Sequence, residues 1–443
     1  MSVRTIFLAA LLVSARGLVA GQEVVEFALS EPNLTVEGLA VGPDGNVWFT
    51  ENASQFVGRL GTLAFAKGLG QISASGEITE VPLSGPGVVL GAFNAGPVLG
   101  SDGNFWFADI GFIPAQAAIG WSTSTGAVTG VSLVANFVSS LTEGPDGNIW
   151  FATSPDVGRI TTSGVVATVN LPPGSGPQGI AAGSDGNLWY TDPVANQIGR
   201  MTTGGVVTTF AIPTANSSPM AITAGPDGAL WFVETKANQI GRSSTAGVIT
   251  EFTIPTQGQP QGIASGSDGN VWFTEAAGKV AWITTSGVIS ELVIPVANAF
   301  PTNIVATPDG HVWFVDGANI GRITPAASCH ADAHTLCLNS DRFSVTADFQ
   351  PTPEGPSTPA TAVPLTPDTG YFWFFDPSNV ELVTKVLDGC STNGNFWFFA
   401  SGLTNVGVQI TVTDTLTGAS KPYSNAVGAA FPPIQDTAAF PCP

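Results

Sequence analysis

Charged residues are scarce in this chain, and positive charge is the scarcest. Only 10% of the 443 residues are charged, with 13 Lys and Arg against 33 Asp and Glu. The resulting net charge of −20 leaves little material for the basic face that phosphate binding requires. We therefore expect neither nucleic acid nor an anionic membrane surface as a partner, while cationic ligands and metal ions remain open.

Long apolar runs are missing from this chain: after the N-terminal segment, no apolar stretch reaches 18 residues. The opening sequence MSVRTIFLAALLVSARGLVAGQ places Arg4 before an apolar run from Ile6 to Val13, and small residues follow around Ala20 and Gly21. This pattern is typical of a secretory signal peptide and is too short for a membrane span. We predict a signal peptide over 1–21, no membrane span in the mature chain, and a secreted location, extracellular or periplasmic.

No cysteine precedes residue 329, and the chain has four in all: Cys329, Cys337, Cys390 and Cys442. In an oxidising compartment an even, clustered set predicts two disulfides, with three pairings open. The segment CHADAHTLC also places His330 and His334 between two of the cysteines, which suggests zinc as an alternative. The two interpretations exclude each other because zinc-bound thiolates are not oxidised, and secretion favours the disulfides.

An internal repeat dominates the first three quarters of the chain. An Asp-Gly step, followed after one further residue by an apolar residue and then Trp, starts at seven positions: Asp44, Asp102, Asp146, Asp185, Asp227, Asp268 and Asp309. The spacing settles near 41 residues, which is the length of one four-stranded propeller blade. The sequence therefore predicts an all-β protein containing a seven-bladed β-propeller.

Each repeat divides into four short strands, as GIASG, NVWFTE, KVAWI and VISELVI show for the unit that begins at Ile263. Asp-Gly between apolar runs predicts a hairpin in which both central residues take positive φ. Trp272 and Phe273 are neighbours, so they point to opposite faces of the sheet. Both faces are then buried, and we interpret the seven repeated tryptophans as core between blades.

The last repeat lacks a fourth strand, and the segment EVVEFAL (23–29) resembles the missing one. We predict that it closes the ring, which gives a propeller over 22–327. Extra residues at 62–72 and 85–96 are expected to be loop insertions. After Ala327 the repeat stops, and several short strands predict a β-sandwich-like module over 328–443. Its aromatic strands GYFWFF and NFWFF are either core strands beside an exposed aromatic patch or a platform for a glycan or a protein.

Acidic residues end the second strand in six of the seven repeats. Because strands one and two are antiparallel, these residues are expected to share one mouth of the ring with Gln178 and Gln261. The candidate ligand-binding acids are Glu51, Asp109, Asp192, Glu234, Glu275 and Asp316. Such a ring could hold Mg²⁺, Ca²⁺ or a cationic ligand. Alternatively, each acid pairs with the arginine of a nearby Ile-Gly-Arg phrase or accepts backbone hydrogen bonds in its turn; these arginines are Arg59, Arg159, Arg200, Arg242 and Arg322.

The phrases WFTE, IGRIT, TSGVITEFTIP and PQGIA resemble the virginiamycin B lyase (streptogramin lyase) family of seven-bladed propellers. The resemblance covers 23–327. It implies linearisation of a cyclic depsipeptide antibiotic by elimination, with a histidine base in a Pro-His phrase. It also implies a Mg²⁺ ion held by a glutamate just before that proline.

The sequence departs from the family at those two positions. Gln178, Met220, Gln261 and Thr302 stand where the histidine would be, and Gly176, Ser218, Gln259 and Phe300 stand where the glutamate would be. The propeller's own histidine, His311, follows an Asp-Gly turn at the opposite end of the strand, and we interpret it as a turn residue.

Three functions remain open at this point. The first is a secreted binding or scaffold protein that recognises an unknown small molecule, glycan or protein, with no catalytic residue assigned. The second is an enzyme, either a carbon–oxygen lyase using another base or a metal-assisted lactone or ester hydrolase. The third is a structural role at a cell surface.

Overall fold

The computed structural model describes residues 13–19, 22–29, 34–56, 62–84, 92–110, 117–134, 137–324, 329, 331–339, 342–415 and 419–442. Contacts divide the chain into two compact units, residues 1–19 with 23–324 and residues 20–22 with 325–443. The predicted domain boundary after Ala327 lies outside the described residues. So does most of the predicted signal peptide, although Val13–Val19 is described and forms strand β1.

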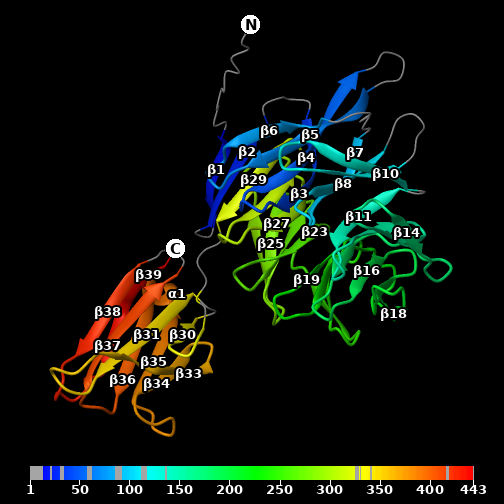
Figure 1. Cartoon of the computed structure of the whole chain (residues 1–443). Helices are drawn as coiled ribbons and strands as arrows, with labels where there is room; N and C mark the ends of the chain where they lie inside the picture. The colour runs from blue at the N-terminus through cyan, green and yellow to red at the C-terminus, as the bar shows by residue number, and fades with distance from the viewer. Residues whose placement is uncertain are drawn as a thin grey trace. The chain divides into compact units, whose positions relative to one another are not determined.

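The described residues of unit 1 form seven sheets of four or five strands, which we call blades 1 to 7 (Figure 1). Blade 1 contains β3 (Leu34–Val41), β4 (Val47–Phe56), β5 (Thr62–Ile72) and β6 (Ile78–Pro82). Blade 2 contains β7 (Ala92–Leu99), β8 (Phe105–Ile110), β9 (Ala117–Ser122) and β10 (Val128–Val134). Blade 3 contains β11 (Val138–Glu143), β12 (Ile149–Thr153), β13 (Asp156–Ile160) and β14 (Val166–Val169). Blade 4 contains β15 (Ile180–Ala182), β16 (Leu188–Asp192), β17 (Gln197–Met201) and β18 (Val207–Ala211).

The remaining blades follow the same order. Blade 5 contains β19 (Pro219–Ala224), β20 (Leu230–Glu234), β21 (Gln239–Ser243) and β22 (Ile249–Thr253). Blade 6 contains β23 (Pro260–Ser265), β24 (Val271–Glu275), β25 (Lys279–Ile283) and β26 (Ile289–Val293). Blade 7 contains β27 (Pro301–Ala306), β28 (Val312–Asp316), β29 (Asn319–Thr324), β2 (Gln22–Ala28) and, at its edge, β1.

The N-terminal strand closes the ring as predicted. Strand β2 pairs antiparallel with β29, and Val25 lies opposite Arg322. The first strands of successive blades lie against each other around the whole ring, and β27 of blade 7 packs against β3 of blade 1. Closure therefore joins two segments that lie about 300 residues apart, and no blade is left with an unpaired first strand.

Side-chain hydrogen bonds join every pair of adjacent blades, and we call these seven bonds the inter-blade clasps. In each, a side chain of one blade donates to a backbone carbonyl at the start of the next blade's first strand, over 2.5 to 2.9 Å. The donors are Asn52, Asn94, Ser139, Thr191, Thr235, Thr274 and Asn303. Carbonyl groups at the ring's inner strands are thus satisfied from the neighbouring blade.

The Asp-Gly turns are hairpin turns, but the expected positive φ at both residues is wrong. Only the glycine takes it, as with Gly45 at +79°, while the aspartate keeps negative φ. The hydrogen bond from Gly45 N to Gly42 O shows that the turn begins two residues before the aspartate. It is therefore a four-residue turn whose last residue is left-handed, not a two-residue turn.

The repeated aspartate has a second task that the turn does not explain. In six blades its carboxylate accepts the indole N–H of the tryptophan four residues later, over 2.9 to 3.3 Å. We call this contact the Asp–Trp clip. All seven tryptophans are at most 3% exposed, so the prediction that they form core is confirmed. The clip satisfies a buried donor that would otherwise have no partner.

One of the two expected loop insertions is a strand. Residues 62–72 form β5, which pairs with β4 over its whole length, so blade 1 carries a long hairpin. The extra residues continue the backbone pairing between β4 and β5, so they extend the sheet. Most of the second insertion, 85–91, lies outside the described residues.

Unit 2 is a sandwich of two sheets, as the spacing of short strands predicts. One sheet contains β30 (Thr335–Leu338), β31 (Phe343–Gln350), β37 (Gly407–Asp414) and β38 (Ser420–Asn425), and β32 (Thr358–Pro359) pairs with β31. The other contains β33 (Thr361–Thr366), β34 (Thr369–Trp373), β35 (Leu382–Gly389), β36 (Asn395–Gly402) and β39 (Ile434–Pro441). A short helix, α1 (Cys390–Asn393), joins β35 to β36.

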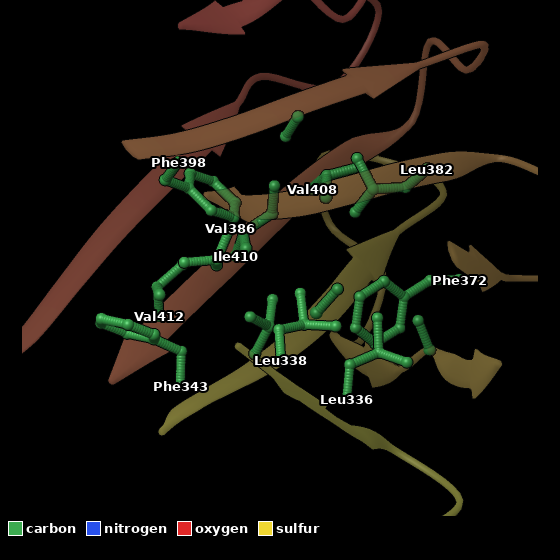
Figure 2. Packing of buried hydrophobic residues seen from close by; sticks show 14 of the residues in the cluster. Leu336, Leu338, Phe343, Phe372, Leu382, Val386, Phe398, Val408, Ile410 and Val412 are labelled. Carbon is green, nitrogen blue, oxygen red and sulfur yellow. The ribbon is translucent and has the colours of Figure 1, made fainter. Parts of the chain in front are cut away.

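The core of unit 2 takes side chains from both sheets. Figure 2 shows Phe343, Ile410 and Val412 of the first sheet facing Val386 and Phe398 of the second, and all five are at most 1% exposed. The aromatic strands alternate between this core and the opposite face, where their side chains are only partly buried: Tyr371, Trp373, Trp397 and Phe399. This arrangement matches a core strand beside a partly exposed aromatic patch.

All four cysteines form disulfides, and the pairs are Cys329–Cys337 and Cys390–Cys442. The predicted pair count is confirmed, and zinc ligation by the first pair is excluded because both thiols are oxidised. His330 lies outside the described residues, and His334 Nδ1 contacts the carbonyl of Ala360 at 2.8 Å. Within the described part of the chain, no helix is long and apolar enough to cross a membrane.

Candidate functional site at the mouth of the propeller

The strand registers bring the predicted mouth residues to one face of the ring. Pro219, Pro260 and Pro301 begin the first strands and lie directly opposite the acids that end the second strands: Glu234, Glu275 and Asp316. The same relation holds for Val36 with Glu51 and for Phe93 with Asp109. The expectation that these acids share a mouth with Gln178 and Gln261 follows directly from this register.

The residue after that first position is set off from the strand pairing by a β-bulge. In blade 6 the register jumps from Pro260 to Ile263, and comparable shifts occur in the other blades for which pairing is complete at this point. A bulged residue leaves the ladder, so its side chain is re-aimed. We call the seven residues at this position the mouth ring: Glu37, Asn94, Ser139, Gln178, Met220, Gln261 and Thr302. All seven are half-buried.

The mouth ring offers amides, hydroxyls and a thioether with one carboxylate, and it contains no histidine. The carboxylate is Glu37, which accepts a hydrogen bond from Thr35 Oγ1 at 3.3 Å. Sequence reasoning missed it because blade 1 has Val36 where four other blades have proline, so the phrase that marks this position is absent. The signal that could have found it is the glycine that follows, Gly38, which aligns with Gly179 and Gly262.

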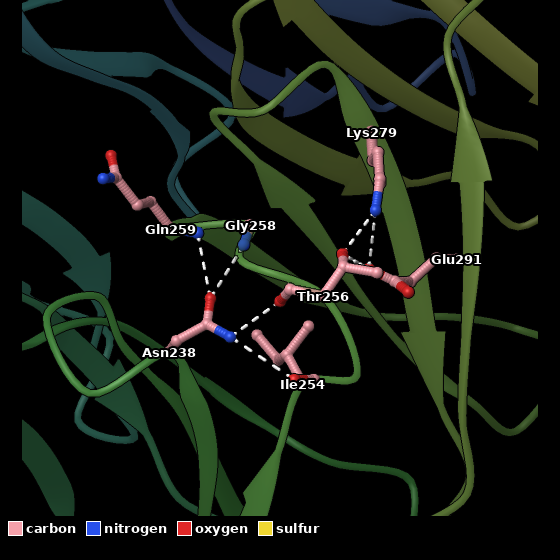
Figure 3. Close-up of polar contacts among 7 residues, drawn as sticks. All are labelled: Asn238, Ile254, Thr256, Gly258, Gln259, Lys279 and Glu291. Atoms are coloured by element: carbon pink, nitrogen blue, oxygen red, sulfur yellow. Dashed lines mark hydrogen bonds and ion pairs between the residues drawn. The ribbon is translucent and has the colours of Figure 1, made fainter.

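Two asparagines position the loops that lead into the mouth ring. Figure 3 shows Asn238 between the segments of this loop: its Oδ1 accepts Gly258 N at 2.8 Å and Gln259 N at 3.1 Å, and its Nδ2 donates to Thr256 O at 2.7 Å. Asn196 makes the equivalent bonds one blade earlier, to Ser217 N. Both asparagines have positive φ, which this residue tolerates better than most. Gln261, near the start of β23, therefore follows directly on a loop held at several points.

The six predicted acids are buried. Their exposed fractions run from 0% to 8%. Asp192 accepts the backbone N–H groups of Gly176 at 3.0 Å and Ala195 at 2.9 Å, and Asp316 accepts Phe300 N at 2.7 Å. These two carboxylates fix the loop before the mouth ring, which favours the turn-structure alternative for them.

Three acids of this set, Glu234, Glu275 and Asp316, lie beside a second carboxylate from the fourth strand of the same blade. Burial and then the neighbouring carboxylate raise the pKa of Glu26 to about 7, beside Asp316, and that of Glu234 to about 8, beside Glu251. Burial and Glu291 likewise raise the pKa of Glu275 to about 7, although Lys279 opposes the rise. Like charges at short range cannot both ionise cheaply, so one carboxyl of each pair keeps its proton to a higher pH than a free carboxyl does.

The arginines of the Ile-Gly-Arg phrases do not pair with these acids. Each described one lies opposite a repeated tryptophan in the strand register, as Arg242 does with Trp231, and stacks over its ring at 5.6 to 5.8 Å. Arg242 Nε also bonds Asp227 of the Asp-Gly turn at 2.7 Å. The suggested acid–arginine pairing is wrong for Arg200, Arg242 and Arg322, because the hairpin returns them to the far end of the blade. Arg59 lies outside the described residues.

The acids of different blades do not gather around one point. Among the described residues, just one group of three metal-ligating side chains lies within 4.8 Å of one another: Asp388, Cys390 and Cys442 of unit 2. Its two cysteines are bonded to each other. His311, as predicted, is a turn residue, with its ring nitrogen 2.9 Å from Asp309.

Comparison with known proteins places these features in a family. Residues 98–340, more than half of the chain, match the model of the Virginiamycin B lyase family. A virginiamycin B lyase of Nocardia farcinica is 29% identical over 36% of this chain, and the chain spans 64% of that relative's length.

Solved structures agree. Selenomethionine-substituted virginiamycin B lyase from Staphylococcus aureus superposes with a TM-score of 0.59 and 36% identity, over 69% of this chain and 99% of that one. A catalytically inactive histidine-to-alanine variant of the S. aureus enzyme, crystallised with quinupristin, gives a TM-score of 0.58 and 35% identity over the same shares. On its matched sequence and its blades, this chain belongs to the virginiamycin B lyase family.

Proposed function

We propose that this chain is an exported binding protein whose mouth ring holds a cyclic peptide or depsipeptide without opening it. The observation that carries the proposal is the composition of the mouth ring, where seven aligned positions contain no histidine. Amide and hydroxyl side chains such as Gln178, Gln261 and Thr302 complement the amide and ester groups of such a ligand. Export is supported by the signal-like N-terminus and the two disulfides.

Elimination from a peptide lactone requires a base that removes a proton from carbon. A neutral glutamine has no such capacity near neutral pH, whereas histidine has. The positions that would supply the family's magnesium ligand are also neutral, since Gln259 precedes Pro260 and Ser218 precedes Pro219. Asp192 and Asp316 are occupied with backbone N–H groups, so neither of them replaces that ligand.

Binding without turnover has a parallel among the relatives. The S. aureus variant that lacks a histidine is catalytically inactive and yet was crystallised with quinupristin. Loss of the base therefore need not remove the ligand site. We expect the same separation of binding from chemistry here.

Calorimetric titration of quinupristin into the full chain tests the binding. We expect saturable binding that weakens at least tenfold when Gln178→Ala and Gln261→Ala are combined, since two amide contacts are lost. Gln409→Ala, an exposed site in unit 2, is the control and should leave binding unchanged. Binding that survives the double substitution would move the site away from the mouth ring.

A second function is favoured by Glu37. In blade 1, Glu37 stands at the position that corresponds to the family's histidine. A carboxylate can act as a general base in an elimination or in lactone hydrolysis. If the chain opens such a ring, Glu37→Gln should abolish the activity while ligand binding persists. If the variant is as active as the unsubstituted chain, Glu37 is not the base.

A further inference from the structure

The second sheet of unit 2 carries a cavity on the face that points away from the core. Val386 and Phe398 face the core, as Figure 2 shows, so the residues that alternate with them on β35 and β36 point to the opposite face. A cavity of about 190 Å³ lies on this outer face, over the neighbouring strands β35, β36 and β39. Its outward side chains are Val383, Lys385, Phe399, Ser401, Pro433 and Gln435.

A small residue among larger ones explains the cavity. Ser401 lies opposite Val383 in the strand register, and its exposed side chain is shorter than those of Val383, Phe399 and Pro433 around it. Backbone pairing between β35 and β36 continues past this position, so the hollow comes from side-chain size and not from a break in the sheet. Its volume is below that of most drug-sized ligand pockets and suits a single six-membered sugar ring.

Aromatic rings lie in and beside the cavity. Phe399 lines it, and Trp397 meets Phe399 edge-on, with ring centroids 6.4 Å apart. On the other side of the cavity, Tyr371 lies opposite Val383 in the register. All three aromatic side chains are only partly buried. Such rings offer flat apolar faces on which the C–H faces of a sugar ring stack, and tyrosine adds a polar tip.

The cavity also contains a cation without a carboxylate partner. Residues 325–443 include three Lys and Arg residues, of which Arg342 and Lys421 form ion pairs with Asp414 and Asp436. Lys385, the third, forms no ion pair with any described carboxylate. In the strand register it lies opposite Phe399, so a charged group and an aromatic ring are presented together.

Other polar groups at the cavity can bond hydroxyl groups. Gln435 lies opposite Phe399 on the side away from Lys385, and the side chains of Gln435 and Ser401 are both exposed. The acid on the same strand as Lys385, Glu381, accepts a hydrogen bond from Asn379 at 2.8 Å and does not pair with the lysine. The cavity therefore combines an aromatic ring, a free ammonium, an amide and a hydroxyl.

We propose that this cavity binds a uronic-acid residue of an anionic glycan. The sugar ring stacks on Phe399, its carboxylate pairs with Lys385, and its hydroxyls bond Ser401 and Gln435. An acidic peptide also carries carboxylates, but it has no flat saturated ring to stack on the phenyl face. The net negative charge of the chain does not prevent one such contact, because charges beyond about 8 Å are screened at physiological ionic strength. The site lies in unit 2 and is independent of the ligand proposed for the mouth ring.

Calorimetric titration of the full chain with uronic-acid oligosaccharides tests this site. The probes are trigalacturonate, trimannuronate and a hyaluronan tetrasaccharide, together with the methyl ester of each and with triglutamate. We expect saturable binding of at least one acidic oligosaccharide, and at least tenfold weaker binding of its neutral ester, because a charge-assisted hydrogen bond is lost. Absence of binding to all three oligosaccharides would overturn the proposal. Equal affinity for the ester, or equal affinity for triglutamate, would also contradict it.

Two substitutions separate the charge from the cavity. Lys385→Met keeps the apolar stem without the charge, so it should weaken binding of the acidic oligosaccharide at least tenfold and leave binding of the ester unchanged. Ser401→Leu fills the cavity and should abolish binding of both. Ser424→Leu changes an exposed serine on β38 of the other sheet and is the matched control, with both affinities unchanged. Equal affinities in all variants, with unchanged Tm values, would place the glycan elsewhere and exclude this cavity.

Discussion

At the scale of single residues, the Asp–Trp clip shows how one side chain stabilises two levels of structure. The carboxylate accepts the backbone N–H that follows the turn and the indole N–H of the next strand, as Asp185 does with Asn187 and Trp189. Burial opposes ionisation of Asp185, but these hydrogen bonds prevail and lower its pKa. The repeat phrase therefore preserves a spacing of four residues between Asp and Trp.

Removing the carboxylate should leave the indole donor buried without a partner. For Asp185→Ala we expect a loss of about 1–3 kcal/mol in the free energy of unfolding, measured by urea denaturation. Asp185→Asn keeps an acceptor oxygen and should lose less than half as much. Equal losses in the two variants would mean that the carboxylate charge, and not the hydrogen bond, is what matters.

The sequence allows some of the site to be predicted at this scale. The acids reach the predicted face because strand pairing follows directly from hairpin length. Burial was not predictable, because nothing in the phrase VWFTE distinguishes a Glu275 beneath a loop from one facing solvent. Arg242 was misplaced because the turn after Glu234 consumes four residues, which returns the arginine to Trp231.

At the scale of elements, the inter-blade clasps explain how separate sheets make one ring. Thr274 of β24 accepts Gly262 N at 2.9 Å and donates to Thr302 O at 2.6 Å, so one hydroxyl links two blades. Thr191 does the same between blades 4 and 5. Sequence could not show this, because a threonine in a buried strand is also explained by its β propensity.

Thr274→Val tests a clasp with little change of shape. The valine leaves Gly262 N and Thr302 O without this partner, and we expect a loss of about 1–3 kcal/mol in the free energy of unfolding. Thr250→Val, on an exposed position of β22, is the matched control and should change stability by less than about 0.5 kcal/mol. A loss no larger than that of the control would show that packing alone holds blades 6 and 7 together.

The closing strand β2 introduces a dependence on pH. Glu26 has its pKa raised from 4.5 to about 7 by burial and by Asp316. Between these two values the folded chain binds more protons at this group than the unfolded chain does. Stability from Glu26 is therefore fully present below about pH 4.5 and is lost as the pH rises through 7.

Glu26→Gln removes this titration. In urea denaturation at pH 5 and pH 8, we expect the unsubstituted chain to lose about 1–3 kcal/mol more than the variant between the two values. The variant keeps a side chain that can bond Asn319, as Glu26 does at 3.4 Å. Parallel pH profiles for the two chains would exclude Glu26 as a source of the dependence.

At the scale of the whole molecule, the two units are stabilised in different ways. Unit 1 arranges seven similar sheets in a closed ring. Because the repeat occurs seven times, the spacing of one aspartate was enough to predict the architecture. Unit 2 has no repeat, so its strand order and its disulfide pairing could not be derived from the sequence. The two disulfides join residues 8 and 52 positions apart.

The longer disulfide loop should contribute more to unit 2. In the chain-entropy model, opening Cys390–Cys442 by serine substitution costs about 4 kcal/mol, and opening Cys329–Cys337 costs about 2.5 kcal/mol. Guanidinium denaturation of the full chain, followed by fluorescence, measures both losses. A larger loss for the shorter loop would mean that local packing around Cys329 outweighs the entropy of the loop.

The most direct test of the account is chromatography of quinupristin after incubation with the full chain, with and without magnesium. Ring opening by elimination adds no water and gives an isomer of equal mass, so retention time reports it where mass does not. The account predicts an unchanged retention time under conditions in which calorimetry shows binding. A new peak that grows with protein concentration would contradict it and would establish the chain as a lyase despite a mouth ring without histidine.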